Sequence, residues 1–432
     1  MPTRSIFAVH TLLRLMRIFF SVSLIGLLTC GCVENNDVRN VRADNALPIE
    51  YESIPISDAT ENYPGFLPEL ALEAVAATSA NASVGDLDMD GDLDVVLVKG
   101  RHWPLEDRVL FGDGSGEFTA GRYLSEIADR SYSGSLADLD LDGDLDIVIS
   151  NDRPDPSLIY LNDGTGAFVI GSTFGKAEWP TRNASVADVN GDGFADVIVA
   201  NRYGDNQGGN YICLNQGNAE FSEDCVLFST ESSTTITPAD FDGNDLTDLV
   251  VPHRDGGQSY VYVQESAEEM SFRRVPFGPA DAVIRASQVA DFNGDGVLDI
   301  VAINAGMSEG DDGTASDRRQ TPGVSIFLGE TGGLFSTAIP IGNAGSVPYA
   351  LSIGDLDLDG TTDIVVGHVE APSVVYFNNG SEPGFTALQF GSAEGTVYGF
   401  GIGDLNEDGQ PDIVAARSGA VNVIYFGVLA RE

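Results

Sequence analysis

Seven copies of an aspartate-rich nonapeptide supply the side chains that are best suited to chemistry in this chain. The first copy spans residues 86–94 and reads DLDMDGDLD. Each copy has Asp at positions one and nine and Asp or Asn at positions three and five. Oxygen ligands on alternate residues of a tight turn converge on one hard cation, and Ca²⁺ takes six to eight oxygens. We therefore predict up to seven calcium sites.

The predicted metal ligands are the four oxygen-bearing side chains that every copy shares. They are Asp86, Asp88, Asp90 and Asp94; Asp138, Asp140, Asp142 and Asp146; Asp188, Asn190, Asp192 and Asp196; Asp240, Asp242, Asn244 and Asp248; Asp291, Asn293, Asp295 and Asp299; Asp355, Asp357, Asp359 and Asp363; Asp404, Asn406, Asp408 and Asp412.

Two other structures could contain loops of this composition: an EF-hand and acidic β-turns without metal. An EF-hand opens in the same way but requires a bidentate Glu at position twelve, where all seven copies are apolar, as at Leu97 and Ile149. Acidic β-turns without metal remain the structural alternative. Seven turns in register, each crowding carboxylates that repel one another, favour metal binding. Copy four has Asp245 in place of the Gly at position six, so we expect its site to be the weakest.

The charge balance limits the classes of partner. The chain has 66 acidic residues against 22 Lys and Arg, for a net charge of −44. Such a balance disfavours nucleic acid and anionic membrane surfaces. The loops hold 28 of the acidic residues, so bound calcium would neutralise much of this charge.

The first part of the chain has the composition of an export signal. Arg4, Arg14 and Arg17 precede an apolar run at 18–28, which ends before two cysteines. This pattern resembles a bacterial lipoprotein signal at residues 1–31, with Cys32 lipidated and Cys30 as the alternative. We expect a flexible polar tether at 32–64 and a location in the outer membrane or on the cell surface. An ordinary secretory signal would also export the chain.

From residue 65 the chain repeats about every 50 residues with four strand-like segments per repeat. A β-rich unit of this period predicts a propeller. The fold class is therefore predicted as an all-β, seven-bladed propeller at 65–432, with a calcium loop between the first two strands of each blade. The last repeat has three strands, so we expect the segment near Phe66–Leu72 to complete the last blade. Cys213 and Cys225 are predicted to form a disulfide across one hairpin.

These loops, together with hairpins such as Gly114-Ser115-Gly116-Glu117-Phe118, resemble the FG-GAP/VCBS family, whose calcium-loop blades also form the integrin α-subunit head. The resemblance covers roughly residues 65–432. It implies the propeller fold and calcium. It also implies adhesion, or glycan or protein binding, since only a minority of similar propellers are enzymes.

A ligand surface is predicted on the face opposite the calcium loops. The residues five positions after each loop's last Asp and six positions before its first Asp are expected on this face, and many of them are polar or aromatic. Arg and Tyr suit anionic or carbohydrate partners. The alternative is that these residues only terminate strands and have no role in binding. An enzyme is not expected, because no catalytic motif is found; the alternative is a polysaccharide lyase or hydrolase, which a Tyr or His with a strongly shifted pKa at the channel mouth would favour. The candidate ligand residues are Tyr132, Arg182, Arg285, Tyr349, Tyr398, His253, His368 and Arg417.

Overall fold

The computed structural model describes residues 64–118, 120–203, 208–221, 224–306, 322–330, 332–342, 346–380 and 384–428. The predicted signal, nearly all of the tether and the lipidation site at Cys32 lie outside these residues. Within the described part, no helix is long and apolar enough to cross a membrane.

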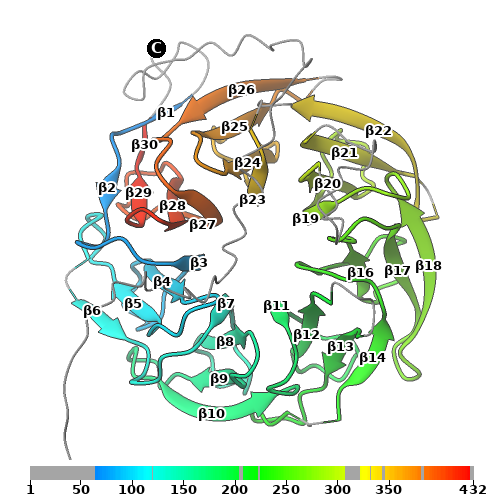
Figure 1. Ribbon diagram of the computed structural model, residues 1–432, viewed down its shortest axis with the longest axis horizontal. Helices are drawn as coiled ribbons and strands as arrows, with labels where there is room; N and C mark the ends of the chain where they lie inside the picture. Colours follow the sequence, from blue (N-terminus) through cyan, green and yellow to red (C-terminus); the bar gives the residue numbers. More distant parts are fainter. Residues whose placement is uncertain are drawn as a thin grey trace, which may run out of the picture. The chain divides into compact units, whose positions relative to one another are not determined.

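The described strands form seven four-stranded antiparallel sheets arranged as blades around a ring (Figure 1), which confirms the predicted all-β, seven-bladed propeller. Within each repeat, strand order follows sequence order from the centre outward. The first three blades are β3 (Ser79–Gly85), β4 (Asp94–Lys99), β5 (Arg108–Phe111) and β6 (Ala120–Tyr123); β7 (Ser131–Ala137), β8 (Asp146–Asn151), β9 (Ser157–Leu161) and β10 (Val169–Phe174); β11 (Thr181–Ala187), β12 (Asp196–Asn201), β13 (Asn210–Cys213) and β14 (Val226–Ser229).

The next three blades follow the same plan, and the seventh differs in its outer strand. They are β15 (Thr237–Ala239), β16 (Asp248–Val251), β17 (Ser259–Ser266) and β18 (Ser271–Phe277); β19 (Ile284–Ala290), β20 (Asp299–Asn304), β21 (Gly323–Glu330) and β22 (Leu334–Gly342); β23 (Pro348–Gly354), β24 (Asp363–His368), β25 (Ser373–Asn378) and β26 (Phe385–Phe390); β27 (Thr396–Gly403), β28 (Asp412–Ser418) and β29 (Val423–Tyr425).

The outer position of the seventh blade is taken by a strand from the beginning of the described chain. β2 (Leu70–Ala71) pairs antiparallel with β29, with Leu70 opposite Ile424. β1 (Gly65–Phe66) pairs in the same way with β30 (Gly427–Val428). These pairings join the two ends of the described chain and cover what would otherwise be an open strand edge.

The second strand of each blade is apolar because it is packed on both faces. In β4, Val95 to Val98 are all fully buried, as expected for a strand between two neighbouring sheets. The hydrophobic residues form seven clusters that each join adjacent blades. The last of them packs Leu405 and Val414 of blade seven against Val95 and Leu97 of blade one. The ring is therefore held by interfaces between blades.

One covalent link joins two strands of the third blade. Cys213, at the end of β13, forms a disulfide with Cys225, just before β14. Cys213 is fully buried in the cluster that joins blades two and three. The disulfide therefore ties the outer strand of this blade to its packed interior.

Candidate functional site

Each acidic loop links the first strand of a blade to the second, and all seven loops have the same backbone path. In every copy the amide of position six donates a hydrogen bond of 2.8–3.1 Å to the Asp at position one, as Gly91 does to Asp86. Position four is left-handed in every copy, including non-glycine residues such as Met89 and Leu141. The loops are thus seven instances of one structure.

The fourth loop keeps this path although it lacks the glycine at position six. Asp245 stands there with a φ of 63° and donates to Asp240 over 3.0 Å. A left-handed φ is uncommon for a residue with a Cβ, although Asp and Asn adopt it more readily than most. The expectation that this site binds metal most weakly stays a prediction.

The Asp at position nine has a structural role that sequence reasoning missed. One of its oxygens accepts from the amide of position two (2.8–3.0 Å) in all seven copies. Its other oxygen accepts from a backbone amide in the last part of the third strand or within two residues after it (2.7–2.9 Å). In the second loop these donors are Leu139 and Asn162. The position-nine carboxylate therefore fixes the loop to its own blade.

Burial makes these position-nine carboxyls weaker acids than an exposed Asp. They are 0–1% exposed, and desolvation raises the pKa of Asp94 and Asp146 to about 6 and of Asp363 to about 7, although two backbone hydrogen bonds oppose the rise in each case. The neighbouring loop carboxylates raise the pKa further.

Position two of each loop is an apolar residue inserted between two blades. These residues are 0–6% exposed; Leu87, for example, packs with Phe111 of its own blade and with Ile147 and Tyr160 of the next. In four blades an amide side chain also donates to the neighbouring loop's position-two carbonyl, as Asn162 does to Leu87 over 2.7 Å. The loop conformation is thereby coupled to the interface between blades.

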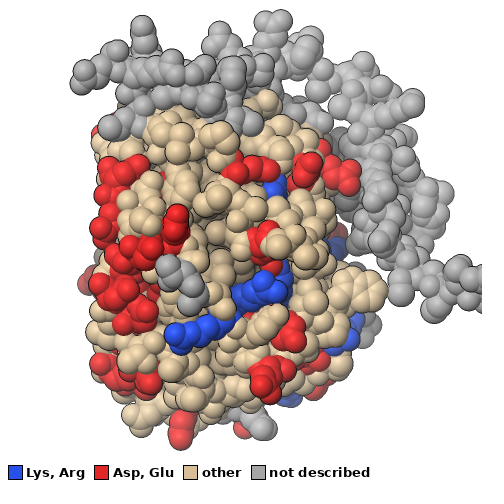
Figure 2. Space-filling model, turned by 90° about the vertical axis from the view of Figure 1, so that its left-hand side faces the viewer, with Lys and Arg blue, Asp and Glu red and all other residues tan. Residues whose placement is uncertain are grey.

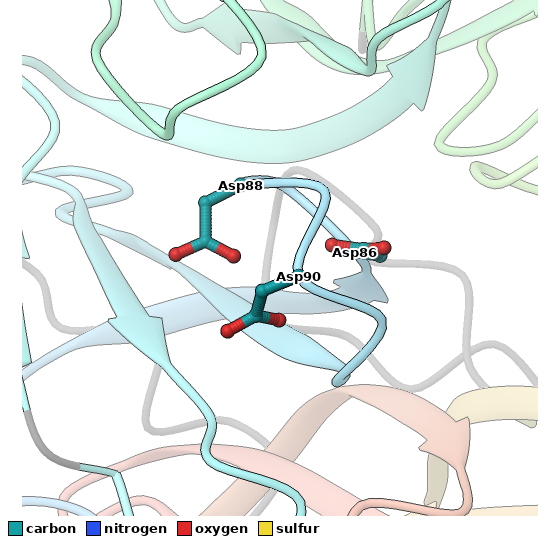
Figure 3. Close-up of side chains that lie close together, drawn as sticks. All are labelled: Asp86, Asp88 and Asp90. Atoms are coloured by element: carbon teal, nitrogen blue, oxygen red, sulfur yellow. The ribbon is translucent and has the colours of Figure 1, made fainter.

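The loop carboxylates have the composition and spacing of a site for a hard cation. Asp86, Asp88 and Asp90 project from one turn between β3 and β4 (Figure 3), and one oxygen of each lies within 4.8 Å of the others. Similar groups form in loops two, four and six. One oxygen each of Asp86, Asp88 and Asp144 is buried without a hydrogen-bond partner among the described residues. A buried carboxylate oxygen of this kind requires a cation or a proton, so the residues fit Ca²⁺.

Seen from the side, acidic side chains concentrate toward one edge of the ring, whereas basic side chains form a separate strip (Figure 2). The loops follow the ends of the innermost strands. The opposite ends of those strands carry the residues predicted to bind a ligand. We call the face with the acidic loops the loop face and the opposite face, with the predicted ligand residues, the mouth face.

On the mouth face, a β-bulge directs one side chain of the inner strand in six of the seven blades. The pairing of the first and second strands skips one residue near the start of the first strand in six blades, and the skipped residue is always the one six positions before the loop. Bulges redirect side chains and are frequent next to functional sites. The skipped residues are Ala80, Tyr132, Arg182, Arg285, Tyr349 and Tyr398.

Five of these residues and Arg101 form a continuous cluster, the mouth cluster. Arg101 lies 3.6 Å above the Tyr398 ring, and Arg285 lies 3.1 Å above the Tyr349 ring. The two rings contact edge to face at 4.6 Å. Cation–π contacts of this kind gain strength as they are desolvated. The mouth cluster therefore joins side chains from blades five, six, seven and one.

The other end of the mouth cluster lies on blades two and three. Arg182 lies 4.3 Å from the Tyr132 ring centroid and forms a 2.7 Å ion pair with Asp152. Arg101 also approaches Tyr132, at 5.7 Å. Arg101 was not among the predicted ligand residues; the signal that could have found it was its position two residues beyond the end of β4.

The charges of this cluster change the acidity of one tyrosine. Burial opposes ionisation of Tyr349, but the guanidinium groups of Arg285, Arg101 and Arg254 outweigh it and lower the pKa of Tyr349 to about 7. Burial lowers the pKa of Arg285 to about 10. A hydroxyl whose pKa is brought near neutral pH by neighbouring guanidinium groups is typical of a functional site.

The other three candidates do not join the mouth cluster. His253, His368 and Arg417 are buried at the ends of second strands (1–9% exposed), where they complete turns. The Nδ1 of His368 lies 2.9 Å from the carbonyl of Pro372, and Arg417 donates through Nε to Val421 and through a terminal nitrogen to Glu69. Burial lowers the pKa of His368 to about 4. The contacts of these three residues are those of polar residues that terminate strands, which was the alternative interpretation.

Comparisons with known proteins agree with this repeat structure. The family model described as FG-GAP-like repeat matches residues 86–149, 138–199, 188–251, 240–302 and 355–415, and each match runs from one loop to the next. No curated protein sequence matches the chain.

Among solved structures, an Agrocybe aegerita lectin that recognises non-reducing terminal N-acetylglucosamine matches with a TM-score of 0.50 and 18% identity, over 73% of this chain and 80% of that chain. BBS1N, solved in complex with ARL6DN, matches with a TM-score of 0.54 and 12% identity, over 83% of this chain and 96% of that chain. At such identities the likeness is one of fold.

Proposed function

Since the chain belongs to the FG-GAP-like repeat family, we propose that it is an exported, calcium-stabilised binding propeller whose mouth face contacts a glycan or protein partner. The observation that carries the proposal is the mouth cluster, in which Arg and Tyr side chains from six blades converge and five of them are directed there by β-bulges. Arg and aromatic residues are enriched at the energetic centres of binding interfaces.

Calcium is proposed at the loop face, at up to seven sites. Asp86, Asp88 and Asp90 and their counterparts would hold the ion, and the position-nine Asp would join them while fixing the loop to the blade. The ion would supply positive charge to crowded carboxylates. Since position two of each loop is packed between blades, a rigid loop would also rigidify the interfaces that hold the ring and, through the inner strands, the mouth.

The similar solved structures support a binding role in general terms. One is a lectin and the other was solved with a protein partner, so the propeller fold serves both kinds of recognition. Export is proposed from the signal-like residues 1–31, with lipidation at Cys32.

Two measurements on the full-length chain, kept in detergent, test the proposal. The first is thermal unfolding in EDTA and in millimolar calcium, where calcium is expected to raise the melting temperature. The second is glycan-array and protein-partner screening of the calcium-loaded protein, compared with R182Q and R285Q variants. Binding that both variants retain in full would place the partner elsewhere and overturn the assignment of the mouth face.

One observation favours a second candidate, a polysaccharide lyase. The lowered pKa of Tyr349 beside Arg285 and Arg101 suits a general base that removes the proton next to a carboxylate whose charge the guanidinium groups balance. The C–O bond at the neighbouring position then breaks, a C=C bond forms and the sugar alcohol leaves with a proton. Unsaturated product from a uronate polymer, absent with Y349F, would establish this activity; intact polymer with tight binding would leave the binding role.

A further inference from the structure

We propose that the mouth cluster binds the carboxylate of an acidic sugar between Arg101 and Arg285. This inference rests on the proposed binding function and specifies the chemical class of the ligand. It depends on three observations: guanidinium groups that lack a carboxylate partner, their common contact with one tyrosine, and an exposed aromatic and an imidazole side chain on the connection that carries Arg101.

The charges on the mouth face are unevenly balanced. On blades two to four, Arg182 and Arg202 form ion pairs of 2.7 Å with Asp152 and Asp255. In contrast, no carboxylate of the described residues lies within ion-pair distance of Arg101 or Arg285. A partly buried cation without a counter-charge is costly, and this chain has 66 acidic residues that could have supplied one.

The two unpaired guanidinium groups lie around the same ring. Their central carbons are 3.6 and 5.8 Å from the centroid of Tyr398. The Nε of Arg101 is buried without a hydrogen-bond partner among the described residues, whereas the Nε of Arg285 donates to the carbonyl of Tyr349 over 2.8 Å. Arg matches a carboxylate through parallel N–H donors, so an anion at this point would satisfy both charges.

The surroundings favour a sugar as the carrier of that carboxylate. Arg101 belongs to the connection between β4 and β5, which also carries Trp103, 55% exposed. Between them, the His102 ring lies within hydrogen-bond distance of the Tyr132 hydroxyl (3.1–3.2 Å). An exposed aromatic side chain on the same connection as this imidazole offers stacking, and the imidazole and hydroxyl offer hydrogen bonds, to a ring with several hydroxyls. An acidic peptide is the competing ligand class, and the experiment below includes one to distinguish it.

Isothermal titration of the full-length chain in calcium tests the proposal with three probes: a short oligogalacturonate, a neutral galacto-oligosaccharide of equal length and a glutamate-rich peptide of equal charge. We expect saturable binding of the oligogalacturonate and about 10-fold or greater weakening in R101Q and in R285Q, in line with the loss of a charged hydrogen bond. R273Q on the outer strand β18, where Arg273 pairs with Glu265 at 3.7 Å, is the matched control and should bind normally.

Melting curves establish that each variant folds, and R101K retains the charge if R101Q does not fold. Equal binding of the neutral sugar or of the peptide would overturn the acidic-sugar inference while leaving a binding propeller in place. Oligogalacturonate affinity that is insensitive to R101Q and R285Q, or to high salt, would also overturn it. Failure to bind any glycan or protein in the screens above would instead overturn the proposed function itself.

Discussion

On the loop face, all seven blades repeat one hydrogen-bond pattern: an amide at position six bonds to position one, and the position-nine carboxylate bonds to two backbone amides, as Asp146 does to Leu139 and Asn162. On the mouth face, the six equivalent bulged positions hold Ala, Tyr, Arg, Arg, Tyr and Tyr. The β-bulge is shared there too, but the side chain at the bulged position varies among Ala, Arg and Tyr from blade to blade.

This difference separates two tasks. A feature that every blade needs in order to pack against the next is repeated in every blade, and the loops meet that description because position two is packed between blades. A surface that recognises one partner has no reason to follow the repeat. The position-nine hydrogen bonds would accordingly govern stability, whereas the mouth cluster would govern recognition with little effect on folding.

Removal of the cations from all loops of the loop face should reduce stability more than any other change. Removal of divalent cations with EDTA should lower the melting temperature of the full-length chain by far more than any single mouth substitution. Each site saturated at 100 times its Kd contributes about 2.7 kcal/mol to the free energy of unfolding, and up to seven sites contribute together. Differential scanning calorimetry measures the effect; equal melting curves in EDTA and calcium would contradict the metal assignment.

Two substitutions in the second loop separate its structural residue from its metal ligands. D146A leaves the buried amides of Leu139 and Asn162 without acceptors, and each such loss costs about 1–3 kcal/mol, so it should destabilise the protein in EDTA as well as in calcium. D142A removes an exposed carboxylate and should destabilise only in calcium. Urea unfolding in both buffers distinguishes them; an equal loss for both variants in EDTA would erase the distinction.

The pH dependence of stability should reverse sign with calcium. In EDTA, the pKa of Asp94 and Asp146 is raised to about 6 in the folded state, above the unfolded value, so their contribution is present at low pH and is lost as pH rises through 6. Acidification from pH 7 to pH 5 should therefore raise the melting temperature in EDTA. In calcium it should lower it, because protons compete with the ion. The same slope in both buffers would refute this account.

The smallest effect concerns the mouth face alone. An ultraviolet titration should show one tyrosine ionising near pH 7, because the charges of Arg285, Arg101 and Arg254 stabilise the Tyr349 phenolate. Y349F should remove this step, and R285Q should move it to higher pH without a large change in melting temperature. Binding of an anionic ligand should weaken as pH rises through 7, since the phenolate would repel it. Affinity that is constant across pH 6–8 would contradict this.

The fold class and the number of blades could be predicted from the residues alone, because the signals involved are local and repeated: an acidic turn, an apolar second strand and a hairpin recur in register. The acidic loops that the structure shows were likewise visible as spacing. The second role of position nine was not visible, because its partner amides lie 7 and 16 residues away for Asp146 and are chosen by how the third strand pairs.

Which polar residues of the mouth face meet could be established only from the folded ring. Arg285 and Tyr349 are 64 residues apart in sequence, yet the Nε of Arg285 donates a hydrogen bond to the carbonyl of Tyr349. Their contact depends on closure of the ring and on the β-bulge that redirects each side chain. His368 and Arg417 occupy equally regular positions, but they end second strands, where packing between blades buries the side chain. Spacing from a loop gives a residue's height in the blade; pairing and burial decide the direction in which it points.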